Sequence, residues 1–99
     1  SLSMFTIHAL VEYGSNTVLA TELLKTAALG HPIVSREEPV IVRMSNFAEN
    51  GIEMELVFWA ENSWDIGNYK SEIRFEIDRL FREHQVHFAY PTRTLINKA

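Results

Sequence analysis

The chain contains 99 residues, of which 46% are hydrophobic and 22% charged, so it can bury the core of one compact domain. Nine basic and thirteen acidic residues give a net charge of −4, which argues against a nucleic-acid-binding surface. The lack of cysteine excludes disulfides and thiolate metal sites. No segment is long and apolar enough to cross a bilayer. We therefore expect one domain without a membrane span or a nucleic-acid partner.

The first half of the chain predicts a strand followed by a helix. Apolar residues alternate over residues 5–13, and turn residues follow at 14–16. Residues 1–3 are expected to be a cloning remnant outside the fold. Asn16 is a suitable N-cap, and Gly30 is a stop signal. Between them, helical spacing places five apolar residues on one face, namely Ala20, Leu23, Leu24, Ala27 and Ala28.

The clearest strand pattern lies at residues 51–59. Four apolar residues recur there at a spacing of two, with Glu53 and Glu55 between them, which indicates a half-buried antiparallel strand: Ile52, Met54, Leu56 and Phe58. Val57 and Trp59 make the far end apolar on both faces. A preceding strand at residues 40–45 is expected to pair with it. The two would be joined by a tight turn in which Asn50-Gly51 supplies positive φ angles.

A second helix is predicted to end near His84, because its apolar residues follow a helical stripe through Ile66, Tyr69, Ile73, Ile77, Leu80 and Phe81. Val86, Phe88 and Tyr90 then alternate in a short strand that Pro91 closes. The order of elements predicts the α+β class. The expected fold is a ferredoxin-like βαββαβ sandwich, with an antiparallel sheet, both helices on one face, and an extra C-terminal extended strand.

The domain is expected to occupy residues 5–91, and residues 92–97 form a separate extended segment. This segment is rich in β-forming residues but too short to be stable unpaired. We therefore interpret it as an assembly strand that pairs with other chains. The candidate oligomer interface consists of Thr92, Arg93, Thr94, Leu95 and Ile96.

Side chains that could carry chemistry are sparse. The four histidines include one close pair, His84 and His87, which straddles the end of the second helix and is interpreted as surface rather than metal-binding. Glu53 and Glu55 share a strand face, but a solvated face carries such residues routinely. No nucleophile set and no glycine-rich phosphate loop is present. We expect no catalytic residue, no metal and no cofactor, and hence no enzyme.

Two other functions hosted by this fold are disfavoured. An RNA-recognition domain would show aromatic and basic residues where Glu53 and Glu55 stand. An acylphosphatase-like enzyme would need an arginine in the loop after the first strand, and residues 13–17 contain no basic residue. A ferredoxin-like module that binds a small regulatory ligand remains the alternative hypothesis, because the fold hosts many functions.

Four stretches, in this order and spacing, resemble the C-terminal cytosolic α/β domain of the small-conductance mechanosensitive channel (MscS-like) family. They are Val11-Glu12-Tyr13-Gly14-Ser15-Asn16, Glu38-Pro39-Val40-Ile41-Val42-Arg43, Leu56-Val57-Phe58-Trp59 and Phe88-Ala89-Tyr90-Pro91-Thr92-Arg93-Thr94. The chain departs from the family pattern at Ala89, where the family usually has proline, at Thr92, where it has glutamine, and at Gln85, where glycine is common.

The resemblance implies a non-catalytic part of a larger channel in the cell's inner membrane. Transmembrane helices upstream of this chain would form a tension-gated pore, and this domain would help to build a cage on the cytoplasmic side. The channel would be a homoheptamer that releases solutes under osmotic stress. Residues 92–96 match the family's last strand, which joins the same strand of the other subunits in a small β-barrel.

Overall fold

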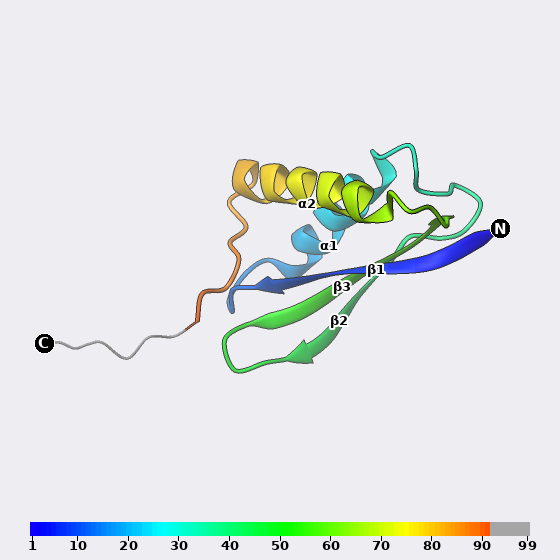
Figure 1. The fold of residues 1–99 in the computed structure, drawn as a ribbon. Coiled ribbons are helices and arrows are strands. Elements are labelled where there is room, and N and C mark those ends of the chain that lie inside the picture. The colour runs from blue at the N-terminus through cyan, green and yellow to red at the C-terminus, as the bar shows by residue number, and fades with distance from the viewer. Residues whose placement is uncertain (92–99) are drawn as a thin grey trace, which may run out of the picture.

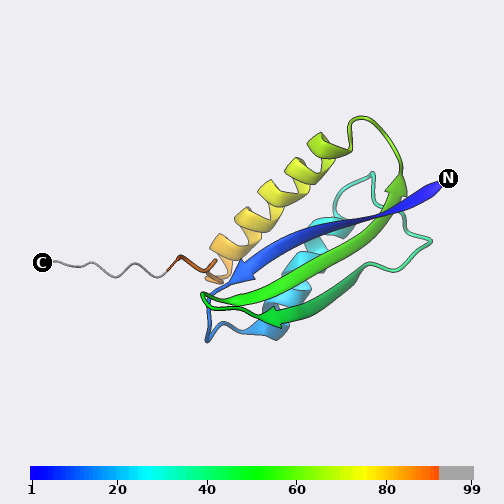
Figure 2. The ribbon, with the colours of Figure 1, turned by 60° about the horizontal axis from the view of Figure 1, so that its bottom comes forward.

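The computed structural model describes residues 1–91, which form a three-stranded antiparallel sheet with two helices on one face. Strands β1 (Leu2–Val11), β2 (Ile41–Phe47) and β3 (Ile52–Glu61) lie in the order β1-β3-β2, so β3 is central. Helix α1 (Thr17–Leu29) follows β1, and α2 (Ile66–Glu83) follows β3. Figure 2 looks onto the open face of the sheet, with α1 behind it. The predicted α+β class and the placement of both helices are confirmed.

Strand β3 forms the centre of the core, as its alternating pattern predicts. Its helix-facing side chains are each no more than 6% exposed, namely Ile52, Met54, Leu56 and Phe58. Val57 faces the open side, yet it is also buried, between its cross-strand neighbours Thr6 and Ile41. Trp59 is partly buried on the same side. The far end of β3 is therefore covered on both faces, which confirms the prediction.

Strand β1 is longer than the sequence indicates. It begins at Leu2, which pairs with Glu61, rather than at Phe5. The strand can start earlier because β3 extends to Glu61, so that residues 2–4 lie in antiparallel register with residues 59–61. The expectation that residues 2 and 3 lie outside the fold is corrected, since both belong to the sheet.

The two helices follow their sequence signals closely. Asn16 caps α1, because its side-chain oxygen accepts a hydrogen bond of 3.0 Å from the amide of Leu19. The buried residues of α1 are those predicted: Ala20, Leu23, Leu24, Ala27 and Ala28. Helix α2 buries Ile73, Ile77, Leu80 and Phe81. His31, just after α1, connects the end of α1 to α2. Its Nε2 lies 2.6 Å from Glu72 Oε1, and its ring makes a T-shaped contact with the ring of Tyr69.

The hairpin between β2 and β3 is confirmed, but the reason given for its glycine is wrong. The amide of Ala48 donates to the carbonyl of Gly51 at 2.9 Å. Within residues 1–91, positive φ angles occur only at Gly14 and Gln85. A Cβ on Gly51 would lie 2.7 Å from the oxygen of Val11 and 2.7 Å from the Cβ of Ala89. Glycine is therefore needed there because other chain segments approach closely.

The predicted strand at residues 86–90 is reduced to one antiparallel bridge between Val11 and Phe88. The amide of Glu12 donates to His87 at 2.9 Å, and the amide of Ala89 donates to Leu10 at 3.0 Å. Bonds in such a ladder recur at every second residue, so the next donor on this segment would be residue 91. Residue 91 is proline and has no N–H. The ladder stops there, and the described sheet has three strands.

Candidate assembly surface at the C-terminal exit

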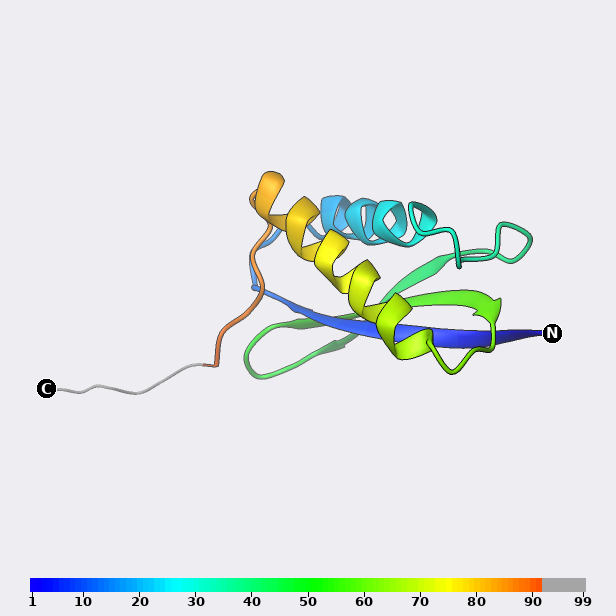
Figure 3. The same ribbon diagram turned by 45° about the horizontal axis from the view of Figure 1, so that its top comes forward.

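The predicted interface residues Thr92, Arg93, Thr94, Leu95 and Ile96 lie outside the described residues, so their arrangement stays a prediction. The structure does show what leads to them. Residues 84–91, called the exit segment here, run from the end of α2 across the end of the sheet (Figures 1 and 3). The position of this segment decides where any assembly strand must begin.

The exit segment starts with a defined helix cap. Gln85 has φ 60°, and the amide of Val86 donates to the carbonyl of Phe81 at 2.8 Å. The amide of Gln85 donates to Arg82 at 3.3 Å. These two bonds and the left-handed residue make a Schellman cap, which normally favours glycine at the left-handed position. The predicted end of the second helix near His84 is thus confirmed, and the chain turns out of its helical path at Gln85.

Packing then holds the exit segment against the core. Val86 is 6% exposed and belongs to the core cluster. The ring of Phe88 stacks on that of Phe81, with centroids 4.9 Å apart. The bridge to Val11 fixes the backbone at the same level. Helix cap, ring stack and bridge together direct the last part of the exit segment to the end of the sheet where the β2–β3 hairpin lies (Figure 1).

Several large apolar side chains are exposed at this end of the molecule. Tyr90 is 80% exposed at the end of the exit segment, and Phe47 is 70% exposed beside the hairpin turn. Tyr13, in the loop after β1, is partly exposed and donates its hydroxyl hydrogen to the carbonyl of Ala48. Exposed aromatic side chains are enriched at protein interfaces. Phe47 was missed from the sequence, where its position just before a turn was the only signal.

The candidate residues on the open sheet face do not form a carboxylate pair. Glu55 Oε1 lies 3.1 Å from Arg43 Nε on the neighbouring strand, so its charge is balanced. Glu53 is exposed, with Leu10 and Asn46 as its cross-strand neighbours. This arrangement is that of an ordinary solvated sheet face.

The histidines are dispersed, and His84 and His87 do not come together as ligands. His84 Nε2 lies 3.6 Å from Glu83, and His87 is exposed in the exit segment. Within residues 1–91, no group of three or more potential ligands could hold a metal ion. His31 accepts a hydrogen bond at Nδ1 from the amide of Ile33 at 3.1 Å. Its Nε2 is therefore the protonated nitrogen that donates to Glu72.

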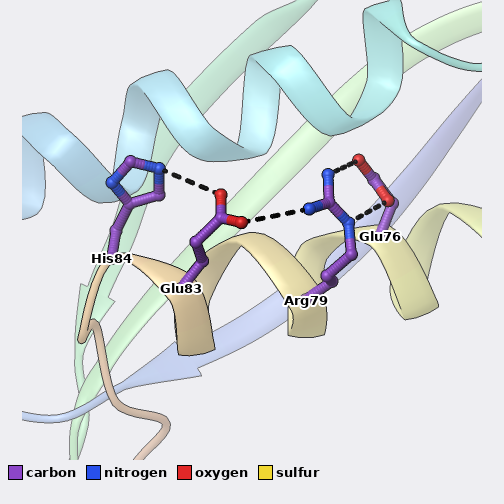
Figure 4. A network of polar contacts seen from close by, with 4 residues as sticks. All are labelled: Glu76, Arg79, Glu83 and His84. Carbon is purple, nitrogen blue, oxygen red and sulfur yellow. Dashed lines mark hydrogen bonds and ion pairs between the residues drawn. The ribbon is translucent and has the colours of Figure 1, made fainter.

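A chain of charged contacts runs along the exposed side of α2 (Figure 4). Arg79 bonds to both carboxylate oxygens of Glu76, at 3.0 and 2.6 Å, and its third nitrogen lies 3.4 Å from Glu83. The bond from Arg79 lowers the pKa of Glu76 and raises that of the guanidinium itself. A hollow of about 710 Å³ runs beside these residues, and Phe75 is its one apolar lining residue. A solvated helix face explains this arrangement.

No helix among residues 1–91 is long and apolar enough to span a membrane. Residues 5–88 match the family described as "Mechanosensitive ion channel MscS, C-terminal". The chain therefore belongs to the family of MscS C-terminal domains.

Two similar proteins extend this assignment. The "Large-conductance mechanosensitive channel MscMJLR" of Methanocaldococcus jannaschii is 31% identical over 84 residues. That match covers 80% of this chain and 23% of the relative. The closed-state crystal structure of Helicobacter pylori MscS has the same fold, with a TM-score of 0.85, 16% identity, and coverage of 100% of this chain and 39% of that one. The chain thus spans less than half the length of either protein.

Proposed function

We propose that this chain is the non-catalytic assembly domain of a mechanosensitive channel that releases solutes during osmotic stress. The channel lies in the inner membrane through segments outside this chain, and this domain helps to form a cage on the cytoplasmic side. The family match over residues 5–88 carries the proposal. Its similarity to MscMJLR over most of the chain supports the same class of protein.

The same proposal assigns Thr92 to Ile96 as the strand that joins copies of the chain, in a homoheptamer. The exit segment supports this role, because three separate contacts direct the chain to the end of the sheet and Pro91 removes the next donor to β1. Thr94, Leu95 and Ile96 then follow with a β-forming sequence. A strand that leaves its own sheet needs backbone partners elsewhere.

The experiment compares variants of the full-length parent protein. Leu95→Asp combined with Ile96→Asp should lower the yield of the assembled oligomer, measured by native mass spectrometry of the purified channel. It should also reduce survival of osmotic downshock by cells that lack other mechanosensitive channels. Phe75→Asp is the matched control, since Phe75 is 75% exposed on α2 and away from the exit. Normal assembly of the double variant would refute the assignment of the interface to these residues. A parent protein that gives no tension-gated current in membrane patches would refute the channel function.

Hydrogen exchange gives a second test of the interface. The amides of Thr94 to Ile96 should gain protection by orders of magnitude when the 99-residue chain is compared with the assembled channel, because protection requires backbone partners. The amides of Met54 to Phe58 serve as the internal control, since they belong to the central strand in both states. Equal protection of the two stretches in a monomer would show that residues 94–96 pair within their own domain.

A further inference from the structure

The two edges of the sheet differ in how they are protected against pairing with other strands. β2 carries an arginine at position 43 and a bulge between Met44 and Asn46, which are two devices that block edge pairing. β1 spans ten residues without a lysine, an arginine, an acidic residue, a proline or a register shift. A long regular edge of this kind can accept a further strand.

The register shows which backbone groups are available. Leu10 accepts from Ala89 on the side of β1 that faces away from β3. Because successive residues of a strand alternate in this direction, Met4, Thr6 and His8 also present their N–H and C=O groups outward. Within the described part of the chain, these outward groups have no backbone partner. Pro91 prevents the exit segment from continuing the ladder beside them.

The edge is hollowed on both sides along its second half, at residues 7–10. Between β1 and α2 lies a cavity of about 130 Å³, lined by Ile7, His8, Ala9, Arg74, Ile77 and Phe88. On the open face, a second hollow of about 440 Å³ is lined by His8, Ala9, Leu10 and Glu53. Figure 3 shows α2 passing above β1. An added strand would thus lie under α2, with room for side chains on both of its faces beside His8.

The charges on the α2 side of this edge favour an acidic partner, whereas Glu53 lines the hollow on the open face. Arg74 lines the cavity and has no ion pair or side-chain hydrogen bond within residues 1–91. Asp78, one turn further along α2, is already paired with Arg82. Lys70 lies one turn before Arg74 on the same helix face, also without an ion pair in this part of the chain. β1 itself carries no acidic residue to neutralise these cations.

We propose that the outward edge of β1, from Met4 to His8, binds an extended acidic peptide segment of another protein as an added antiparallel strand beneath α2. A second copy of the domain fits less well, because pairing β1 with β1 would bring two α2 helices to the same side of the joined sheet. Adjacent strands lie roughly 5 Å apart, whereas packed helices need about 8–10 Å. A single extended segment brings no helix. The site does not involve residues 92–96 and goes beyond the channel function.

The test is an NMR titration of the 99-residue chain with a capped ten-residue peptide of alternating valine and glutamate. The amides of Met4, Thr6 and His8 should shift and become protected from exchange. A peptide of alternating valine and lysine should bind at least about tenfold more weakly. Arg74→Glu should weaken the binding of the acidic peptide by a similar factor. Equal affinity for the two peptides, or shifts confined to other residues, would overturn the proposal.

Two variants separate backbone pairing from surface attraction. Thr6→Pro removes an outward N–H and should abolish binding, since proline is tolerated on a free strand edge. Thr6→Val keeps that N–H and should bind like the unchanged chain. If Thr6→Pro does not fold, the same test is made with a peptide N-methylated at alternate residues, which should not bind. Undiminished binding of that peptide would contradict strand addition, as would exchange protection of Thr6 before any peptide is added.

Discussion

The rings of Phe81 and Phe88 stack with 21° between their planes, which joins the last turn of α2 to the exit segment. Phe81 is 1% exposed, whereas Phe88 is partly buried and packs against the core from outside. Phe88 also forms the one bridge between the exit segment and β1. This stack therefore links the position of the chain's exit to the stability of the core.

Phe88→Ala should destabilise the domain by about 2 kcal/mol, less than for a fully buried phenylalanine, because only part of its ring leaves water on folding. Urea unfolding of the 99-residue chain measures the loss. Phe75→Ala is the matched control and should change the free energy of unfolding by less than about 0.5 kcal/mol, since Phe75 is 75% exposed. Equal losses for the two variants would mean that the ring stack adds no stability.

Leu56→Ala should cost roughly 2 to 5 kcal/mol, because Leu56 is fully buried at the centre of β3 and its removal leaves a cavity. Glu53→Ala, on the opposite face of the same strand, should stay within about 0.5 kcal/mol. Chemical denaturation of both variants provides the comparison. A loss below about 1 kcal/mol for Leu56→Ala would contradict the assignment of the strand's faces.

Gly51→Ala should destabilise the hairpin even though Gly51 does not have a positive φ angle. The new Cβ would lie 2.7 Å from the carbonyl oxygen of Val11 and 2.7 Å from the Cβ of Ala89, so the exit segment or β1 must shift. Overpacking of this kind costs about 1–3 kcal/mol. Thermal unfolding measures the loss.

Gly67→Ala is the comparison for this effect, because a Cβ at position 67 meets no atom within 4 Å. It lies in the first turn of α2, where alanine has the higher helix propensity, and should leave the domain as stable or slightly more stable. If Gly51→Ala behaves in the same way, the close approach at the hairpin is not tight in solution.

The sequence predicted the elements whose signals are local. The alternation through Met54 and Leu56 identified the core face of β3, and the cap at Asn16 identified the start of α1. The single-bridge exit strand could not be read in the same way. The length of that strand depends on its register against β1, because this register makes residue 91 the next position that should donate a hydrogen bond. The pairing of two segments distant in sequence sets that register. Leu2 was missed for a similar reason, because only the extension of β3 to Glu61 gives it a partner.

The candidate interface was predicted only in part. The interface residues Thr92 to Ile96 were inferred from sequence composition and family resemblance, and they remain a prediction. The contacts that position the exit segment could not be derived from the sequence. Phe81 and Phe88 lie on either side of the left-handed residue Gln85, so no helical spacing relates them. The exposed position of Phe47 was likewise hidden, because a strand pattern does not say where the covering helix ends.

Gln85→Gly should stabilise the domain by about 0.5 to 1 kcal/mol, because Gln85 has φ 60° and glycine adopts this conformation without steric cost. Gln85→Ala is the control, since it keeps a Cβ and should bring little change. Both are compared by their midpoints of urea unfolding. A midpoint that falls in Gln85→Gly would mean that a contact of the glutamine side chain outweighs the backbone strain.

The contact between Glu76 and Arg79 should give a small stabilisation that depends on pH. The bond from Arg79 holds the pKa of Glu76 below its ordinary value of 4.5, so the folded state favours the ionised carboxylate. The stabilisation is therefore fully present above pH 4.5 and is lost as the pH falls through the lower folded value. The difference in melting temperature between the unchanged chain and Glu76→Gln should shrink between about pH 6 and about pH 3. It should also shrink in high salt, because both groups are at the surface.

Glu22→Gln, exposed on α1, is the control and should show no such trend. A difference for Glu76→Gln that does not vary with pH would show that the contact contributes nothing in solution.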